Sequence, residues 1–198
     1  MKKLLIVISI VIVVGSVISS AIYSTAQQRS EYAGQEKREI KSLSNSDLEE
    51  LRAGKGWGLA KAAELNGYPG PVHLIEMKDK LGLSRQQLLK IEELYSGMKK
   101  EAVPLGLKLI ELEKNLDSGF ANKTINKERL DELLKEIGQV TADLRSAHLS
   151  VHLKTPDILS QKQISTYNRL SGYNSTDPCK SVPEGHDPAM WRKHNNCG

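Results

Sequence analysis

One five-residue phrase occurs twice in the chain, and each copy stands at the start of a stretch with helical apolar spacing. The copies are Leu83-Ser84-Arg85-Gln86-Gln87 and Leu159-Ser160-Gln161-Lys162-Gln163. In a capping box, a serine accepts a hydrogen bond from the backbone N–H three residues later, and the glutamine there bonds back to the serine N–H. Each leucine also fits a hydrophobic staple with an apolar residue four positions past the serine, Leu88 or Ile164. The phrase therefore predicts two helix starts.

Two long apolar stripes with helical spacing follow the first copy. The first stripe predicts a helix over 85–116 that is interrupted and kinked at Pro104, followed by a chain reversal over 119–124. The second stripe predicts a helix capped by Asn126 that runs to about residue 154. Two long amphipathic helices joined by a short loop form an antiparallel hairpin. The mature chain has no β-strand pattern, so the fold class is predicted to be all-α.

Short helices are expected on both sides of this hairpin. Ser46-Asp47-Leu48-Glu49 fits another capping box and predicts a helix to about residue 52, ended by a glycine-rich segment at 54–58. A second short helix is expected over 59–65, and Pro71 suits the first position of a third over 72–81. The second copy of the phrase predicts a last helix to about residue 170.

The two ends of the chain differ in composition from this helical middle. Residues 27–45 are polar without apolar periodicity and are predicted to form a flexible arm. After Gly172 the chain is rich in Asn, Ser, Asp, Pro, Gly, His and Cys, which is typical of a tail. The expected divisions are a signal segment (1–26), an N-terminal arm with short helices (27–65), a helical hairpin domain (66–172) and a C-terminal tail (173–198).

The first residues have the order of a secretory signal. Met1-Lys2-Lys3 precedes an apolar run, and small residues follow. We predict cleavage after Ala26 or Ala21. The alternative is an uncleaved membrane anchor, because the uncharged stretch from Leu4 to Ile22 is 19 residues long.

The charge of the mature chain argues against nucleic acid as a partner. Loss of residues 1–26 removes two of the 28 basic residues and none of the 24 acidic ones, which leaves a net charge of +2. Nucleic-acid binders usually carry a concentrated basic patch. We therefore expect no nucleic-acid partner, and contact with a membrane only through an uncleaved signal segment.

An export signal, a long α-hairpin and paired Leu-Ser-x-x-Gln phrases together resemble the Spy/CpxP-type periplasmic proteins and the related periplasmic heavy-metal sensors and zinc-resistance-associated proteins. The resemblance covers roughly residues 66–170. It implies a small helical protein of the bacterial periplasm, often a homodimer, that works without ATP. Some members bind unfolded proteins, and others bind transition metals and report on them. The glycine-rich segment and the Cys/His tail depart from the pattern of the plain chaperones.

His148 and His152 are the strongest candidate metal ligands. They lie four residues apart within the apolar stripe of their helix, so both point inward or line a groove. Two packed core histidines remain the alternative. His73 and Met77 have the same four-residue spacing. If their helix packs across the C-terminal end of the second long helix, they could bind the same metal as His148 and His152. In the alternative, Met77 is a core residue and His73 is a helix-start residue. Glu76 is a further possible oxygen ligand. The resemblance implies a similar site, with histidines from two helices and a nearby methionine.

The tail contains a second, weaker set of candidate residues: Cys179, His186, Met190, His194 and Cys197. In an oxidising compartment the two cysteines are expected to form a disulfide. Asp187-Pro188 fits a helix start, which places Met190 and His194 on one face. Imidazole and thioether suit copper or another soft metal, and a disulfide leaves both groups available.

The sequence contains no motif that indicates an enzyme. Ser84 and Ser160 have capping roles, and no Gly-x-Ser-x-Gly, P-loop, His-Glu-x-x-His or dinucleotide-binding turn occurs. We therefore predict a non-enzymatic periplasmic protein that binds Cu, Zn, Ni or Co through His148 and His152 and passes that state to an envelope signalling protein. The alternative is an ATP-independent chaperone whose hairpin cradles unfolded client proteins.

Overall fold

A computed structural model describes residues 30–173, 179, 182, 187–195 and 197. The chain divides into two compact units, Met1–Lys37 and Arg38–Gly198. The described part of the first unit contains a short 3-10 helix, η1 (Gln35–Lys37). The predicted signal segment lies outside the described residues. None of the helices in the described ranges has both the length and the hydropathy needed to cross a membrane.

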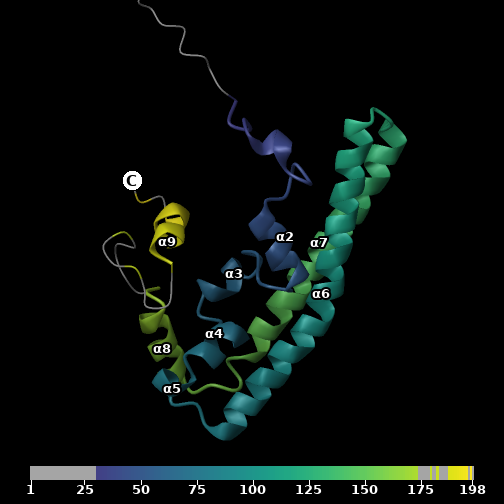
Figure 1. Ribbon diagram of the computed structural model, residues 1–198. Coiled ribbons are helices and arrows are strands. Elements are labelled where there is room, and N and C mark those ends of the chain that lie inside the picture. The colour runs from purple at the N-terminus through teal and green to yellow at the C-terminus, as the bar shows by residue number, and fades with distance from the viewer. Residues whose placement is uncertain (1–29, 174–178, 180–181, 183–186, 196, 198) are drawn as a thin grey trace, which may run out of the picture. The chain divides into compact units, whose positions relative to one another are not determined.

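The described part of the second unit is built from α-helices and the loops between them. In chain order these are α2 (Asn45–Arg52), α3 (Lys61–Glu64), α4 (Pro71–Glu76), α5 (Lys78–Leu81), α6 (Arg85–Ala121), α7 (Lys127–Lys154), α8 (Gln161–Leu170) and α9 (Pro188–His194) (Figure 1). The described residues contain no β-strand, only an isolated bridge between Ile40 and Leu43. The all-α prediction is confirmed.

The long helices α6 and α7 pack against each other as an antiparallel pair (Figure 1). Asn126 caps α7 through its side chain, which accepts a hydrogen bond from the Arg129 N–H at 2.9 Å. The helix α6 continues through Pro104, where an interruption was expected, and through Gly119 to Ala121. The predicted hairpin packing is therefore confirmed, with a longer first helix.

The reversal lies at 122–126 rather than at 119–124. The N–H groups of Thr124 and Ile125 donate to the Gly119 carbonyl, and Lys123 adopts a φ of +56°. A Cβ at Gly119 would lie 3.3 Å from the Ile125 side chain. The glycine therefore provides space for the returning loop and does not end the helix.

Both copies of the repeated phrase form complete capping boxes. Ser84 accepts from the Gln87 N–H at 3.2 Å, and Ser160 accepts from the Gln163 N–H at 3.3 Å. The two glutamine amides also bond to each other: Gln87 Nε2 donates to Gln163 Oε1 at 2.9 Å, and Gln163 Nε2 donates to Gln87 Oε1 at 3.1 Å. The two copies thus connect the first turns of α6 and α8, which are far apart in the sequence.

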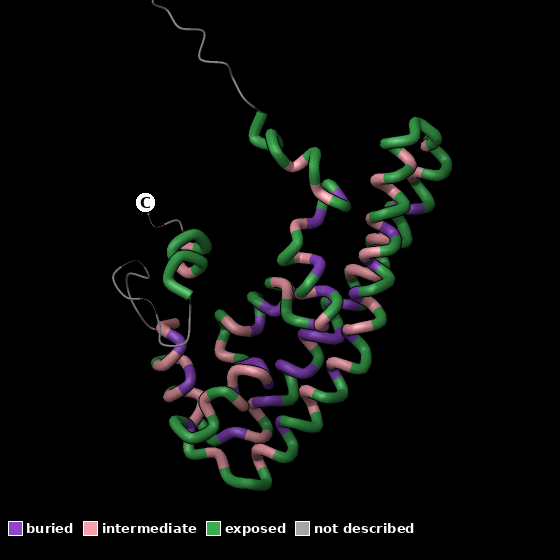
Figure 2. Tube along the Cα trace, in the orientation of Figure 1, coloured by how far each residue is buried: buried purple, intermediate pink, exposed green. Residues whose placement is uncertain are grey.

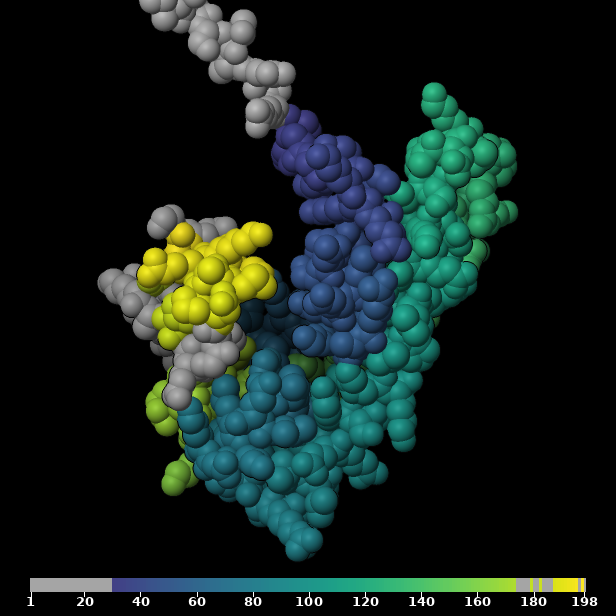
Figure 3. All heavy atoms as spheres, in the orientation of Figure 1, coloured from purple at the N-terminus to yellow at the C-terminus, as the bar shows by residue number. Residues whose placement is uncertain are grey.

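One hydrophobic cluster joins the segment before the hairpin to the hairpin itself. Its buried members are Ile40, Leu43, Leu48, Leu51, Ala102, Leu109 and Leu144. Figure 3 shows the atoms of α2 against those of α6. The expectation of a flexible arm over 27–45 is therefore wrong for Ile40 and Leu43, and the compact unit shows no boundary at residue 66.

A second cluster lies where α4, α5, α6 and α8 meet. Its buried members are Leu74, Leu81, Ile91, Leu159 and Tyr167, and Met77 packs against them. Figure 2 shows that buried residues concentrate where the short helices meet the hairpin, whereas its far end is largely exposed. The single helix expected over 72–81 is broken at Met77, which separates α4 from α5.

The first capping box begins two residues earlier than expected. Ser44, not Ser46, caps α2, and its side chain accepts from the Asp47 N–H at 3.1 Å. With Ser44 as the cap, the flanking staple positions are Leu43 and Leu48, which are both buried in the first cluster. The burial of these two leucines selects the earlier start.

Candidate metal site

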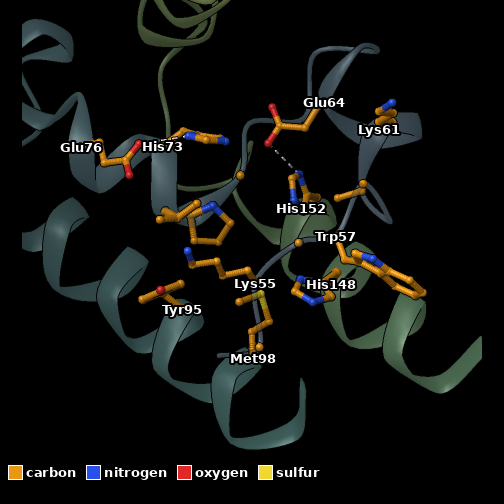
Figure 4. Close-up of a pocket in the computed structure, with 17 residues that line it drawn as sticks. Lys55, Trp57, Lys61, Glu64, His73, Glu76, Tyr95, Met98, His148 and His152 are labelled. Carbon is orange, nitrogen blue, oxygen red and sulfur yellow. Dashed lines mark hydrogen bonds and ion pairs between the residues drawn. The ribbon is translucent and has the colours of Figure 1, made fainter. Parts of the chain in front are cut away.

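A pocket of about 580 Å³ lies among α6, α7 and the segment 54–76 (Figure 4). The residues in its lining that can bind a metal or carry charge are Lys55, Lys61, Glu64, His73, Glu76, Met98, His148 and His152. Three stretches far apart in the sequence therefore supply one cavity. Four residues were predicted to converge, and three of them, His73, His148 and His152, line this pocket.

His148 and His152 lie deep in this pocket. They are 2% and 4% exposed, although both are polar. Residues four apart on a helix project from the same face, so both imidazoles of α7 face the cavity. The predicted inward direction is confirmed.

The ring of His152 is oriented by a backbone group. Its Nδ1 lies 2.8 Å from the carbonyl oxygen of Tyr68. A carbonyl only accepts, so Nδ1 carries the hydrogen, and in the neutral ring Nε2 has the free lone pair. The Thr155 hydroxyl donates to the Pro69 carbonyl at 2.7 Å and holds the same segment against α7. This is the usual arrangement around a metal-binding histidine, whose second nitrogen is fixed by an outer hydrogen bond.

One ring nitrogen of His148 lacks a hydrogen-bond partner among the described residues. Its Nε2 is buried and has no hydrogen-bond partner in the described structure. Burial lowers the pKa of His148, and the nearby His152 and Lys99 lower it further, so the ring is neutral at pH 7. An unpartnered buried polar group costs about 1–3 kcal/mol, and such groups in native proteins call for an explanation. A bound metal ion would supply the missing partner.

Close approach of the chain around His152 depends on Gly70. A Cβ at this position would lie 2.5 Å from Glu64 Oε1 and 2.9 Å from His152 Cε1. No side chain fits there without moving one of these groups. The glycine therefore allows the 68–70 backbone, the carboxylate and the imidazole to meet at one point.

Glu64 was not identified from the sequence. Its Oε1 lies 3.9 Å from His152 Nδ1, and its Oε2 accepts from the hydroxyls of Tyr167 at 2.5 Å and Tyr173 at 3.3 Å. Burial raises the pKa of both tyrosines, and the adjacent carboxylate raises it further. Tyr167 is 103 residues away along the chain, so no local pattern pointed to the contact. Glu64 connects the pocket to α8 and the residues after it.

The methionine of the pocket is Met98 and not Met77. Figure 4 shows the Met98 sulfur on the side that faces His148. Met77 packs into the second cluster, where burial of its apolar side chain is favourable. His73 and Glu76 line the pocket, but they bond to each other, with Nδ1 and Oε2 3.1 Å apart, and His73 is 40% exposed. Of the four residues expected to converge, His73, His148 and His152 line the pocket and Met77 does not, whereas Met98 lines it.

The tail candidates form a separate set. Cys179 and Cys197 are joined by a disulfide, with Cα atoms 5.5 Å apart. Asp187 caps α9 by accepting from the Met190 N–H at 2.8 Å, and His194 ends the same helix. His186 lies outside the described residues. Met190 is 51% exposed.

The donor set of the pocket is small. Within the described part of the chain, no three His, Cys, Asp or Glu residues come together to hold a metal ion. The pocket lining contains the two imidazoles of α7 and the Met98 thioether. No family model matches the chain, and comparison with curated proteins and with solved structures found no significant similarity.

Proposed function

We propose that the protein is a non-enzymatic metal-binding protein of the bacterial envelope, which holds a transition-metal ion between His148, His152 and Met98. The observation that carries this proposal is the buried, unpartnered Nε2 of His148 beside a second imidazole whose Nδ1 is already fixed. Both rings line the same cavity. The large majority of buried polar side-chain atoms in native proteins have a hydrogen-bond partner, so this nitrogen calls for an explanation.

The chemistry of the donors favours copper. Imidazole suits copper, zinc and nickel, whereas a thioether selects the soft Cu(I) ion. Calcium and magnesium prefer oxygen ligands, and the pocket offers few of these, because the Glu64 oxygens already contact two tyrosines and His152. The order of preference we propose is copper first, then zinc, nickel and cobalt.

Glu64 provides a route for a signal in this proposal. A metal on His152 would alter the charge next to Glu64, which is hydrogen-bonded to Tyr167 of α8 and to Tyr173. The metal state would thereby reach α8 and a partner in the envelope. Membership of the Spy/CpxP group, a periplasmic location and a homodimer belong to the same proposal, supported by the paired phrases and their Gln87–Gln163 contact.

Calorimetric titration of the metal-stripped protein with Cu(I), Zn, Ni and Co tests the proposal. We expect about one ion per chain for the protein, and no saturable binding to the pocket for His148→Ala/His152→Ala. Lys135→Ala/Gln139→Ala, which changes two exposed residues four apart on α7 outside the pocket lining, is the matched control and should bind as the parent does. Circular dichroism checks that each variant is folded. Equal affinity of the double variant and the parent would remove the pocket from consideration.

The chaperone alternative has one supporting observation. The hairpin exposes several large apolar side chains: Leu89, Leu107, Phe120, Leu134 and Leu153. Exposed apolar surface suits binding of unfolded chains. Suppression of client aggregation by both the parent and the double variant, with no effect of metal, would favour this alternative.

A further inference from the structure

The pocket is much larger than a bound metal ion requires. Its volume of about 580 Å³ lies within the range of roughly 300–1,000 Å³ that is typical of small-molecule sites. His148, His152 and Met98 occupy one part of its wall. The remaining part is formed by the glycine-rich segment, α4 and the first half of α6.

The charges in this remaining part are unbalanced. Both lining carboxylates are engaged, Glu64 with two tyrosines and Glu76 with His73. In contrast, Lys55 and Lys61 are exposed residues that line the pocket, and their side-chain ammonium groups have no hydrogen bond or ion pair within the described structure. Figure 4 shows Lys55 extending across the cavity toward its Tyr95 side, away from His148. The pocket thus presents two unpaired ammonium groups that a metal ion would not use, and Lys55 is the one that extends across the cavity.

The wall around this cation is largely apolar. Pro71, Val72 and Tyr95 line the pocket, and Trp57 lines it on the other side, beside His148 and across the cavity from the Lys55 ammonium (Figure 4). Trp57 is held in place, since its Nε1 donates to Asp47 Oδ1 at 2.9 Å and its φ is +43°. A non-glycine residue at positive φ is uncommon and persists where the surroundings determine it. The indole is therefore a fixed wall of the pocket.

We propose that the pocket binds a small amphipathic carboxylate, with its carboxylate paired to Lys55 on the Tyr95 side and its apolar body extending across the cavity toward Trp57. The Lys55 ammonium is a point charge that can pair with a monoanion, and the lining includes no arginine, whose planar fork would favour bidentate recognition of a phosphate. The proposal goes beyond metal binding and does not require it. The two sites share a cavity but use different residues.

Octanoate is the probe for the test, added to the metal-free full chain. Trp57 reports binding in a Trp191→Phe background, because the chain has two tryptophans. We expect saturable octanoate binding that weakens about tenfold in Lys55→Gln, the effect of losing a hydrogen bond to a charged group. Lys135→Gln, which removes an exposed lysine of α7 outside the pocket lining, is the matched control and should bind as the parent does.

Octan-1-ol and octylamine separate charge recognition from apolar adsorption. We expect the alcohol to bind more weakly than octanoate and the amine not to bind. Equal binding of octanoate and octanol, or an unchanged affinity in Lys55→Gln, would overturn the proposal. Octanoate binding should persist in His148→Ala/His152→Ala, so failure of the carboxylate site and failure of the metal site are distinguishable.

Discussion

His148 and His152 share one face of α7, but burial of the two imidazoles should cost different amounts of free energy. His152 has a partner in the Tyr68 carbonyl, whereas His148 Nε2 has none. In the metal-free protein we expect His148→Leu to leave the free energy of unfolding unchanged or to raise it by about 1 kcal/mol, because an unpaired group is removed. His152→Leu should lower it by about 1–3 kcal/mol, because the Tyr68 carbonyl loses its donor.

Urea unfolding with a chelator present measures both changes. The comparison between the two variants is internal, since both replace a buried imidazole of the same helix by the same side chain. If His148→Leu proved as destabilising as His152→Leu, His148 Nε2 would have a partner in the metal-free protein. The argument for a metal from its unpaired nitrogen would then fail.

Individual residues show where sequence reasoning succeeds and where it stops. The helical position of His148 and His152 was enough to predict that they face inward, because periodicity fixes direction. The methionine that lines the pocket was not predictable in this way. Met77 and Met98 both lie in apolar helical patterns, and only the packing of α4 and α5 against α8 decides that Met77 enters a core cluster while Met98 lines the pocket.

At the scale of elements, the contact between α2 and α6 depends on Gly106. A Cβ there would overlap the backbone carbonyl of Leu51, which cannot move without displacing α2. We expect Gly106→Ala to lower the free energy of unfolding by about 1–3 kcal/mol. Gly97→Ala is the control on the same helix, where a Cβ meets nothing within 4 Å, and should raise it by about 0.5–1 kcal/mol.

Thermal and urea unfolding of the two glycine variants test whether α2 packs closely against α6 at Gly106. A stabilising effect of Gly106→Ala similar to that of Gly97→Ala would show that α2 does not lie so close to α6. Loss of the α2 contact alone should also expose Trp57, whose indole is anchored to Asp47 of α2. A red-shifted tryptophan emission is therefore expected for Gly106→Ala only.

Asp47 makes the start of α2 sensitive to acid. Burial alone would raise the pKa of its carboxyl, but hydrogen bonds from Ser44 and Trp57 outweigh it and lower the pKa below 3.8. A lowered pKa means that the stabilisation is present above pH 3.8 and is lost as the pH falls through the folded-state value. We expect Asp47→Asn to cost about 1 kcal/mol of unfolding free energy at pH 6 and less at pH 3.

Urea unfolding of the parent and Asp47→Asn at pH 6, 4 and 3 measures this convergence. Ser46→Ala is a suitable control, because Ser46 lies in the first turn of α2 but is not its cap. A difference between Asp47→Asn and the parent that stays constant with pH would contradict the assigned role of the carboxylate.

The elements themselves were predictable wherever a local signal determined them. The capping boxes of Ser84 and Ser160 and the cap at Asn126 mark helix starts at the predicted residues. Ser44 and Ser46 both fit a capping box, and the choice depends on burial of Leu43 and Leu48 against other helices. Tertiary packing therefore decides between equivalent local patterns.

At the scale of the whole compact unit, the pocket results from long-range packing. Glu64, Met98 and His152 come from separate segments that no periodicity connects. The link between Glu64 and Tyr167 spans most of the unit and places a carboxylate beside His152. A sequence can therefore indicate the histidine pair, but the rest of the cavity depends on how α3, α4 and α8 pack on the hairpin.

X-ray absorption spectroscopy of the protein loaded with Cu(I) tests the central claim most directly, because it reports the atoms bound to the metal. The proposed site predicts two imidazole nitrogens and one sulfur around copper. Met98→Leu should remove the sulfur and keep both imidazoles, whereas His148→Ala/His152→Ala should lose the bound metal. A copper environment without imidazole, or one that these substitutions leave unchanged, would contradict a metal site between His148 and His152.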